Sequence, residues 1–318
     1  MNAANALRVG VVGVGSLGQA HARIYSELPQ TNLVGIYDID TERATEIAAK
    51  HGTRVFASID ELAEQVEAAS LVVPTHLHRE VGAQLLAAGV HLLIEKPIAS
   101  TTQEAMDLVA MAKERDLILQ VGHIERFNPV LSFLEAAAHN LRFIEAHRLA
   151  PYPPPRDGLH PRGTEVSVVL DLMIHDLEVI MHLVRAPVKS FHAVGVSVLS
   201  PSEDIANVRL HFENGCVANV TASRISPERM RKVRVFLPDA YLSLDYQSQS
   251  GELYRKAATG IERVQVPIEK GEPLAIELAA FAECVRHRGD PVVSGDHAAE
   301  ALKLAVEITN RIREGNTA

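Results

Sequence analysis

The sequence has few cysteines, no long apolar run and no stretch of signal-peptide type, and each absence excludes a class of protein. Two cysteines, Cys216 and Cys284, occur among 318 residues, and they form no CxxC pair. This excludes a disulfide framework and favours a reducing compartment. No stretch of about 18 residues is uninterruptedly apolar, and residues 1–8 lack the regions of a signal peptide. We therefore expect a cytoplasmic protein with no membrane partner.

Basic residues are also fewer than acidic ones, 31 against 40. The formal net charge is −9 at pH 7, and no basic stripe is present that could release counterions from nucleic acid. We interpret the local cluster of basic residues over 229–234 as a solvated strand face. Nucleic acid is therefore excluded as a partner. The hydrophobic content of 47% and the length of 318 residues are typical of a globular protein with about two domains.

A glycine-rich turn follows the first apolar run, residues 7–12, which predicts a strand. In a Gly-x-Gly-x-x-Gly turn the first glycine permits the tight turn, and the second lets the backbone approach a pyrophosphate. The third lets the next helix pack close to the sheet. The helix N-terminus then binds the phosphates. The residues assigned to this role are Gly13, Gly15, Ser16, Leu17 and Gly18.

A carboxylate follows at the position that distinguishes two cofactors. Residues 32–38 predict a second strand, which ends at Asp38, where an adenosine ribose would lie. A carboxylate there accepts hydrogen bonds from a 2′-hydroxyl and repels a 2′-phosphate, and no Arg or Lys follows before Arg43. The pattern therefore predicts NAD as the cofactor, in preference to NADP.

Alternating strands and helices predict a first domain over residues 1–122. The pattern indicates βαβ units, and hence a doubly wound parallel Rossmann sheet with helices on both faces. The expected strands are 7–12, 32–38, 54–56, 69–73, 91–94 and 117–121, and the expected helices include 41–50, 59–67, 78–88 and 102–116.

Residues 123–318 predict a second, α+β domain for substrate binding and oligomerisation. A helix is expected over 165–184, a large and mostly antiparallel open sheet over 188–266, and two closing helices over 273–288 and 297–313. The proline-rich loop 151–155 is expected to cross the mouth of a site. One face of the open sheet would be exposed in a monomer, so we expect a homo-oligomer, a dimer or a tetramer, formed through this sheet.

Lys96 is the first candidate for chemistry. It follows the strand at 91–94, and ligands of open α/β sheets bind at the carboxyl ends of strands, where a nicotinamide would lie. The bond from Lys96 to Pro97 is a candidate cis peptide. The competing interpretation is a surface lysine before a turn proline.

Asp171 and His175 are the second candidate constellation. They are four residues apart in the expected helix, so they project from one face, and a carboxylate beside an imidazole can orient a general base. Their neighbours are apolar, so both need buried partners. The competing interpretation is a helix cap or a satisfied core histidine.

Polar residues after the last parallel strand could bind the phosphate or the hydroxyls of a sugar, or could belong to a domain linker. The candidate substrate-binding residues are His123, Arg126, Asn128 and Arg162. No metal is expected, because His76 and His78 have no third ligand close by in the sequence. A serine hydrolase is excluded, because no G-x-S-x-G elbow occurs.

Several separate motifs together resemble one family. The glycine turn, Pro74-Thr75-His76-Leu77-His78, Glu95-Lys96-Pro97, Asp171-xxx-His175 and a late loop with Gly295 resemble the Gfo/Idh/MocA oxidoreductases nearly from end to end. The resemblance implies an NAD(P)-binding Rossmann domain and a C-terminal domain whose sheet covers the nicotinamide and mediates oligomerisation. It also implies that Lys96 contacts substrate and nicotinamide ribose, that Asp171 and His175 lie near the reacting carbinol, and that Thr75, His78 and Glu95 belong to the cofactor site. Many relatives carry Asn where this sequence has Thr75.

A narrower resemblance concerns two segments, 121–129 and 169–176. It is to a branch of the family whose members oxidise UDP-N-acetylglucosamine to a 3-keto sugar, for amide-linked lipid A or surface glycans. The resemblance thus implies a dehydrogenase that acts on the CH–OH group of a nucleotide sugar. A free polyol such as inositol is the alternative substrate, and a noncatalytic NAD-binding sensor is the alternative function.

Overall fold

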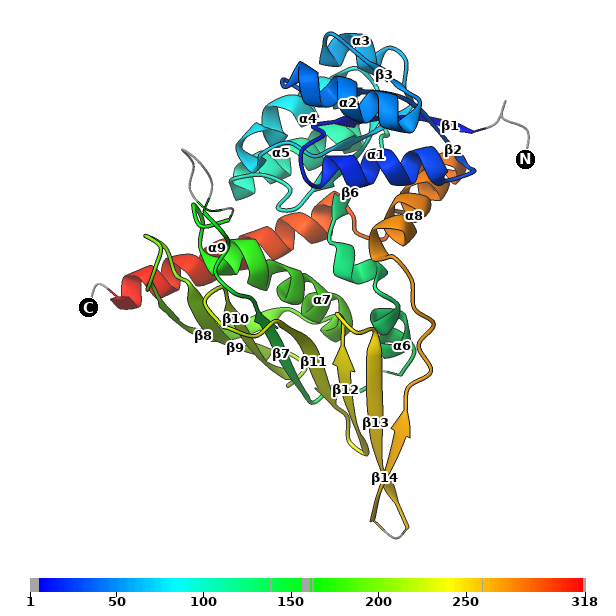
Figure 1. Cartoon of the computed structure of the whole chain (residues 1–318). Helices are drawn as coiled ribbons and strands as arrows, with labels where there is room; N and C mark the ends of the chain where they lie inside the picture. Colours follow the sequence, from blue (N-terminus) through cyan, green and yellow to red (C-terminus); the bar gives the residue numbers. More distant parts are fainter. Residues whose placement is uncertain (1–5, 138, 156–160, 162, 259, 317–318) are drawn as a thin grey trace. The chain divides into compact units, whose positions relative to one another are not determined.

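The computed structural model describes residues 6–137, 139–155, 161, 163–258 and 260–316, which fold into two compact units (Figure 1). Unit 1 comprises the chain up to residue 124 together with 272–300, and unit 2 comprises 125–271 and the chain from 301 onward. The sequence pattern predicts that all of 123–318 belongs to the second domain. Helix α8 (Pro273–His287) instead returns to unit 1, because its apolar residues Leu278 and Phe281 are buried in that unit's core.

Unit 1 is built on a six-stranded parallel sheet in the order β3-β2-β1-β4-β5-β6. The strands are β1 (Leu7–Val12), β2 (Thr31–Tyr37), β3 (Arg54–Val55), β4 (Ala68–Leu71), β5 (His91–Glu95) and β6 (Leu119–Gly122). The order reverses between β1 and β4, which is the arrangement of a doubly wound Rossmann sheet. The predicted fold class of this half is confirmed.

Helices cover the sheet of unit 1 in two groups, because β1 is apolar on both faces. Val9 and Val11 pack into a core with α1 and α8, whereas Gly10 lies against Leu62 of α3. The helices are α1 (Gly18–Glu27), α2 (Thr41–His51), α3 (Ile59–Ala63), α4 (His78–Ala87), α5 (Thr102–Glu114) and α8. The helix predicted over 59–67 is shorter in the structure, and ends as α3 at Ala63.

Unit 2 is built on an eight-stranded sheet in the order β14-β13-β12-β11-β7-β10-β9-β8, and all its pairings but one are antiparallel. The strands are β7 (Phe143–Leu149), β8 (Val188–Val196), β9 (Ile205–Phe212), β10 (Val217–Ser223), β11 (Met230–Phe236), β12 (Ala240–Asp245), β13 (Ser250–Ala257) and β14 (Gly260–Gln265). The predicted, mostly antiparallel open sheet is confirmed. The exception is the pair of β7 and β10, which is parallel. Strand β7 was not predicted from the sequence.

Helices α6 (Pro129–Ala137) and α7 (Ile174–Val184) belong to unit 2, and the long helix α9 (Gly295–Asn316) begins in unit 1 and ends in unit 2. The helix predicted over 165–184 is only partly regular. Its first part is a π-helical turn, η4 (Val169–Met173), which leads directly into α7. Among the described residues, no helix is both long enough and apolar enough to span a membrane.

Candidate active site

The glycine turn of unit 1 has three glycines with different surroundings. Gly13 has a φ of 89°, and a Cβ built on it would lie 2.6 Å from the carbonyl oxygen of Val72. A Cβ on Gly18 would lie 1.9 Å from the carbonyl oxygen of Gly13. A Cβ on Gly15, by contrast, would meet no protein atom within 4 Å. The fold therefore requires glycine at the first and third positions, but the protein leaves open space beside the second.

The helix behind this turn is suited to an anion. Helix α1 has no acidic residue in its first turn, and its N-cap Leu17 makes no side-chain capping bond. The helix dipole favours negative charge at this end, although the N–H groups of Gln19 and Ala20 already donate to the carbonyl oxygens of Gly15 and Leu17. Gly15 and the N-terminus of α1 thus fit a dinucleotide pyrophosphate, which would fill the open space beside Gly15.

Asp38 lies directly after β2 and also holds the glycine turn in place. Its Oδ2 accepts a hydrogen bond from the backbone N–H of Val14 at 2.7 Å, and its Oδ1 accepts one from Asp40 at 2.9 Å. Each carboxylate oxygen has a second lone pair for a ligand hydroxyl. The sequence pattern predicts a ribose contact for Asp38, but it gives no sign of the hydrogen bond from the Val14 N–H to this carboxylate.

The loops after β4 and β5 are joined by His78. The ring of His78 is buried, and its two nitrogens lie 2.9 Å from the carbonyl oxygens of Pro97 and Val73. Burial lowers the pKa of His78, and the two carbonyl contacts oppose that shift. Its contacts make His78 a brace between the two loops, whereas Thr75, in η2 (Thr75–Leu77), is half-buried beside them.

Lys96 follows β5 directly, and the Lys96–Pro97 peptide is cis, as predicted. The backbone N–H of Lys96 donates to Glu95 Oε2 at 3.2 Å, and His21 Nε2 lies 3.2 Å from Glu95 Oε1. A Cβ built on Gly122 would lie 3.1 Å from the Glu95 carboxylate. Glu95 is thus packed closely on three sides, and it fixes the backbone from which the Lys96 side chain projects.

Asp171 and His175 lie in unit 2, on the π-helical turn and in the first turn of α7. Both are half-buried, whereas Met173 and Ile174 between them are fully buried. A Cβ on Gly163 would lie 2.4 Å from Asp171 Oδ2, so the carboxylate packs against the Gly163 backbone. Irregular π-helical turns occur often at functional sites. The structure thus leaves both the acid and the histidine partly exposed.

A buried arginine holds the residue next to His175. The Arg148 guanidinium binds Asp176 through Nε at 2.7 Å and Nη2 at 3.1 Å, and binds Glu125 through Nη1 at 2.9 Å. All three side chains are at most 4% exposed. Burial raises the pKa of Asp176, and the charge of Arg148 opposes that shift. A two-point clamp of this kind restricts the first turn of α7, and with it the backbone of His175.

The candidate substrate-binding residues that the structure describes are largely internal. Arg126 is buried, and its Nη1 donates to Glu178 Oε1 at 2.6 Å. The amide of Asn128 donates to Glu125 and to the carbonyl oxygen of Tyr246. His123, in unit 1, is also buried. Arg162 lies outside the described residues.

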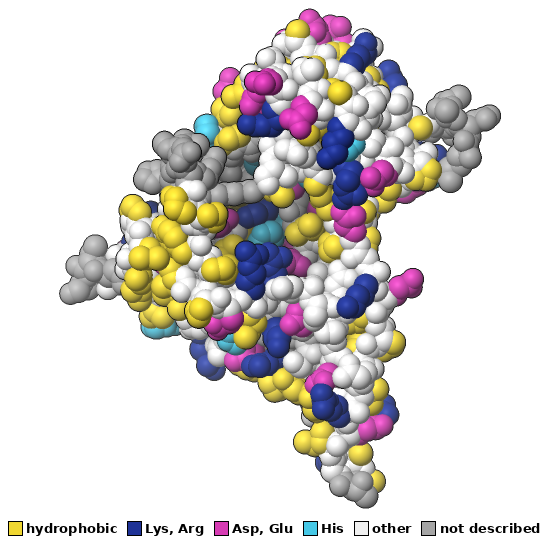
Figure 2. Space-filling model, viewed as in Figure 1, with side chains coloured by type: hydrophobic (Ala, Val, Ile, Leu, Met, Phe, Trp, Pro, Cys, Tyr) yellow, Lys and Arg dark blue, Asp and Glu magenta, His cyan; other side chains and the backbone are white. Residues whose placement is uncertain are grey.

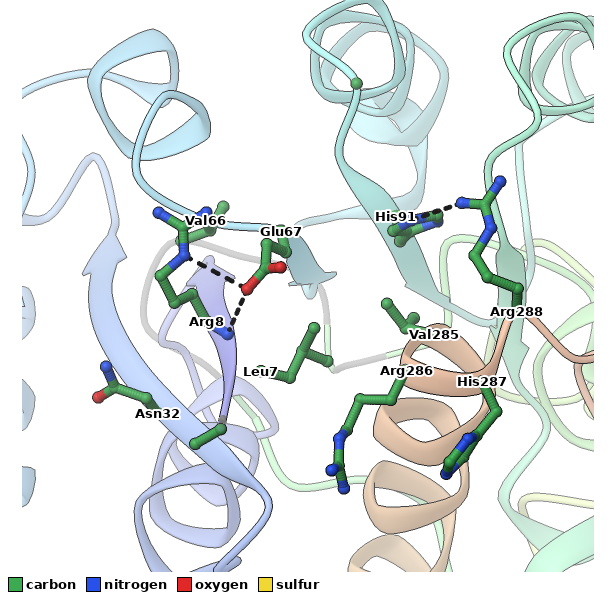
Figure 3. Close-up of a pocket in the computed structure, with 12 residues that line it drawn as sticks. Leu7, Arg8, Asn32, Val66, Glu67, His91, Val285, Arg286, His287 and Arg288 are labelled. Atoms are coloured by element: carbon green, nitrogen blue, oxygen red, sulfur yellow. Dashed lines mark hydrogen bonds and ion pairs between the residues drawn. The ribbon is translucent and has the colours of Figure 1, made fainter. Parts of the chain in front are cut away.

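An open pocket of about 860 Å³ lies at the edge of unit 1 where the strands begin (Figure 3). Leu7, Asn32 and His91, at the starts of β1, β2 and β5, line it, so it lies away from the carboxyl ends of the strands. Its arginines pair with carboxylates: Arg8 with Glu67, Arg286 with Glu283 and Arg288 with Asp116. These pairs balance its charge, so the pocket offers no surplus charge to an anionic ligand. No group of three potential metal ligands occurs among the described residues.

Comparisons with known proteins cover both units. A family model described as "Oxidoreductase family, NAD-binding Rossmann fold" matches residues 7–123, and one described as "GFO/IDH/MocA C-terminal domain" matches residues 140–242. The chain is 37% identical over 309 residues to a UDP-N-acetylglucosamine 3-dehydrogenase of Acidithiobacillus ferrooxidans. This alignment covers 95% of the chain and 96% of the relative.

Two further comparisons also extend over nearly the whole chain. The solved structure of UDP-N-acetylglucosamine 3-dehydrogenase GnnA from A. ferrooxidans matches with a TM-score of 0.90 and 36% identity, over 96% of this chain and 97% of that one. A myo-inositol 2-dehydrogenase of Thermotoga maritima is 26% identical over 335 residues, which cover 97% of both chains. Relatives that act on a nucleotide sugar and on a free polyol thus share the whole length of the chain.

Proposed function

Because the chain belongs to the Gfo/Idh/MocA family of NAD-dependent oxidoreductases, we propose that it oxidises a hydroxyl group of UDP-N-acetylglucosamine to the 3-keto sugar. The observation that carries this proposal is the 37% identity, over nearly the full length, to a UDP-N-acetylglucosamine 3-dehydrogenase. The product would serve the synthesis of amide-linked lipid A or of surface glycans. Inositol is the second candidate substrate, because the T. maritima myo-inositol dehydrogenase aligns over the same length.

Three side chains carry the proposed proton chemistry. His175 takes the proton of the substrate hydroxyl, Asp171 orients the imidazole and stabilises its charged form, and Lys96 hydrogen-bonds the same oxygen. NAD, when bound, supplies the acceptor for the hydride of the carbinol carbon. The half-buried positions of Asp171 and His175 support these roles, since both side chains keep access to solvent.

The cofactor and substrate contacts form a second part of the proposal. Gly13, Gly15, Ser16, Leu17 and Gly18 hold the pyrophosphate, and Asp38 holds the adenosine ribose. Thr75, His78, Glu95 and Lys96 shape the nicotinamide end, where His78 and Glu95 act through the loops they brace. Arg126 and Asn128 support the substrate pocket from inside unit 2, because their contacts are internal.

A panel of substrates tests the proposed reaction. Purified protein is mixed with NAD and with UDP-sugars or free inositols, and the absorbance of reduced nicotinamide is followed. Signal with UDP-N-acetylglucosamine alone supports the proposal, and signal with inositols alone replaces it by the polyol reaction. No signal on any sugar, with NAD binding measured by calorimetry, refutes both and favours a sensor.

Variants test the assigned roles. His175→Ala and Lys96→Met should each lower kcat by about a hundredfold to ten-thousandfold, which is the usual range for loss of acid–base assistance. NAD affinity should persist in His175→Ala. His192→Ala, at an exposed position on β8, is the matched control and should retain full activity. Near-normal turnover of His175→Ala would remove the histidine from the mechanism.

We further propose a homo-oligomer, dimer or tetramer, that forms through the sheet of unit 2. A row of aromatic rings crosses four strands, with centroid separations of 5.5 Å, 4.7 Å and 5.2 Å: Phe143, Phe236, Tyr241 and Tyr254. Hydrophobic side chains also gather over β8 and the neighbouring strands (Figure 2), where Val194 and Val196 are each more than half exposed. Contiguous exposed apolar surface favours burial against a partner.

Light scattering tests the proposed assembly. Phe236→Glu should lower the mass measured by light scattering, whereas Lys50→Glu, at an exposed position on α2 of unit 1, should not. An unchanged mass for Phe236→Glu would remove the aromatic row from the interface. Both cysteines are free thiols, which supports a proposed location in the cytoplasm.

A further inference from the structure

Three ionisable side chains lie in the interior of unit 1, near the end of β5. His21 comes from α1, Glu95 from β5 and Glu277 from α8. His21 and Glu277 are fully buried, and the side chain of Glu95 is 14% exposed. Helix α8 packs on α1 within the same core (Figure 1). Three titratable residues that are largely shielded from solvent need a consistent arrangement of protons.

The hydrogen-bond pattern at His21 determines its tautomer. Nε2 lies 3.2 Å from Glu95 Oε1, and an ionised carboxylate only accepts, so Nε2 carries a proton. Burial opposes ionisation of Glu95, but the hydrogen bond from His21, the electrostatic attraction of the same ring and the charge of Lys96 lower its pKa. Nδ1 of His21 has no hydrogen-bond partner among the described residues. In the neutral ring Nδ1 is therefore a buried acceptor in need of a donor.

The carboxyl of Glu277 can supply the hydrogen-bond donor that His21 Nδ1 needs. Neither of its carboxylate oxygens has a hydrogen-bond partner within the described part of the chain. An ionised carboxylate in that position would be an unpaired buried charge, which is strongly unfavourable. Burial, and then the negative charge of Glu95, raise the pKa of Glu277 well above its ordinary value. Burial therefore favours the protonated carboxyl, whose O–H is a buried donor in need of an acceptor.

We propose that Glu277, His21 and Glu95 form a buried proton-sharing chain that positions Lys96. The Glu277 O–H donates towards His21 Nδ1 through one buried water, because neither group has a direct hydrogen-bond partner within the described residues, and His21 Nε2–H donates to Glu95. Glu95 in turn accepts the backbone N–H of Lys96 at 3.2 Å, so the chain ends at a residue assigned to the reaction. Glu277 and His21 are positioning residues, and their effect on turnover rests on the proposed function.

Other titratable groups face this chain and are already engaged. Tyr25 of α1 lies within electrostatic reach of Glu277, but its hydroxyl pairs with Ser70 Oγ at 2.9 Å. His78 lies within reach of Glu95, but its ring nitrogens face two backbone carbonyls. Neither residue is placed to replace Glu277 as the donor to His21.

The pH dependence of unfolding tests the proton on Glu277 without any substrate. A carboxyl whose pKa is raised on folding stabilises the protein fully below its unfolded pKa, and this stabilisation declines as pH rises towards the folded pKa. Above the ordinary pKa of 4.5, the unfolding constant of the wild type should therefore rise more steeply than that of Glu277→Gln. The expected difference is about tenfold per pH unit.

The controls separate this effect from a general loss of structure. Glu283→Gln removes an exposed carboxyl from the same helix and should leave the wild-type slope unchanged. The ¹⁵N chemical shifts of His21 should show a protonated Nε2 in the wild type. Equal slopes for Glu277→Gln and the wild type would overturn the proposal, and so would a protonated Nδ1 with a bare Nε2.

Turnover tests the link to Lys96. Glu277→Gln keeps a neutral donor and should retain kcat within about threefold, whereas Glu277→Leu removes the donor and should lower kcat about tenfold with KM for NAD unchanged. Equal kcat values for Glu277→Leu and the wild type would overturn the positioning role. If no sugar is oxidised at all, the proposed function fails, but the unfolding and ¹⁵N measurements still decide the proton-sharing chain.

Discussion

Alanine at two glycines of the same turn should have opposite effects, and the comparison tests whether a cofactor occupies the space beside Gly15. At Gly18 a Cβ would lie 1.9 Å from the Gly13 carbonyl oxygen, so the main chain must move. At Gly15 a Cβ meets no protein atom within 4 Å, and the backbone is outside the left-handed region. The protein itself thus has no steric need for glycine at position 15.

The magnitudes follow from these contacts. Gly15→Ala should leave stability unchanged or raise it by about 0.4–1 kcal/mol, because alanine restricts the unfolded chain. Gly18→Ala should lower stability by about 1–3 kcal/mol or more, as expected for overpacking against backbone. If a pyrophosphate lies beside Gly15, Gly15→Ala should weaken NAD binding by roughly tenfold to a hundredfold, which corresponds to about 1.4–2.8 kcal/mol.

Two assays on the same preparations check this prediction. Urea unfolding gives the stability of each variant, and calorimetric titration gives the affinity for NAD. Wild-type affinity for NAD in Gly15→Ala would refute the argument that the cofactor explains this glycine. A loss of stability in Gly15→Ala equal to that of Gly18→Ala would show that the space beside Gly15 is not open in solution.

Three further variants test charges that the fold holds in place. Arg148→Met removes the ion pair of the buried Asp176 and leaves Glu125 with only Arg231, at 3.7 Å, so it should lower stability by about 3–5 kcal/mol in urea unfolding. A loss below about 1 kcal/mol would show that the clamp is replaceable. Burial opposes ionisation of Asp204, but its hydrogen bonds hold its pKa well below the ordinary 3.8, so its stabilisation is present above pH 3.8 and declines as pH falls. Asp204→Asn should therefore be less stable than the wild type at neutral pH, and the gap should narrow in acid unfolding; a constant gap would contradict this. Asp38→Ala should shift the ratio of NAD to NADP affinity by roughly tenfold or more towards NADP in calorimetry, and an unchanged ratio would separate Asp38 from the ribose.

The fold of unit 1 could be predicted because its signals are local. The apolar run 7–12 matches β1 at both ends, and the glycine that follows adopts the positive φ that the turn requires. The cis peptide at Lys96–Pro97 was also foreseen, because proline lowers the preference for trans. Each of these features depends on residues that are neighbours in the sequence.

Features that depend on distant partners were missed. Strand β7 pairs in parallel with β10, about seventy residues later, and neither its composition nor a turn signals that pairing. Helix α8 was predicted as a helix, but its place in unit 1 depends on the fit of Leu278 and Phe281 to a core formed by the start of the chain. The π-helical turn η4 depends on tertiary packing rather than on helix propensity.

The roles of the candidate site residues also depend on partners that are distant in the sequence. Arg126 and Asn128 have the right chemistry for a sugar phosphate, and they follow a strand at the expected edge, so the sequence alone favours a ligand. In the structure the partners of Arg126 and Asn128 come from Glu178 and Tyr246, which lie 52 and 118 residues further along the chain. Those bonds satisfy polar groups that would otherwise be buried alone.

In this protein, residues that support the candidate site are therefore of the same types as residues proposed to contact a ligand. Only the position of the hydrogen-bond partner distinguishes the two groups. Asp176 follows His175 in the sequence, yet a buried arginine clamps Asp176 while His175 remains half-exposed. Glu95 precedes Lys96 in the same way and is held by His21. In both units a largely buried acid is the sequence neighbour of a residue proposed to take part in the reaction. A charge fixed beneath the surface can orient its neighbour because desolvated, charge-assisted hydrogen bonds are both strong and directional.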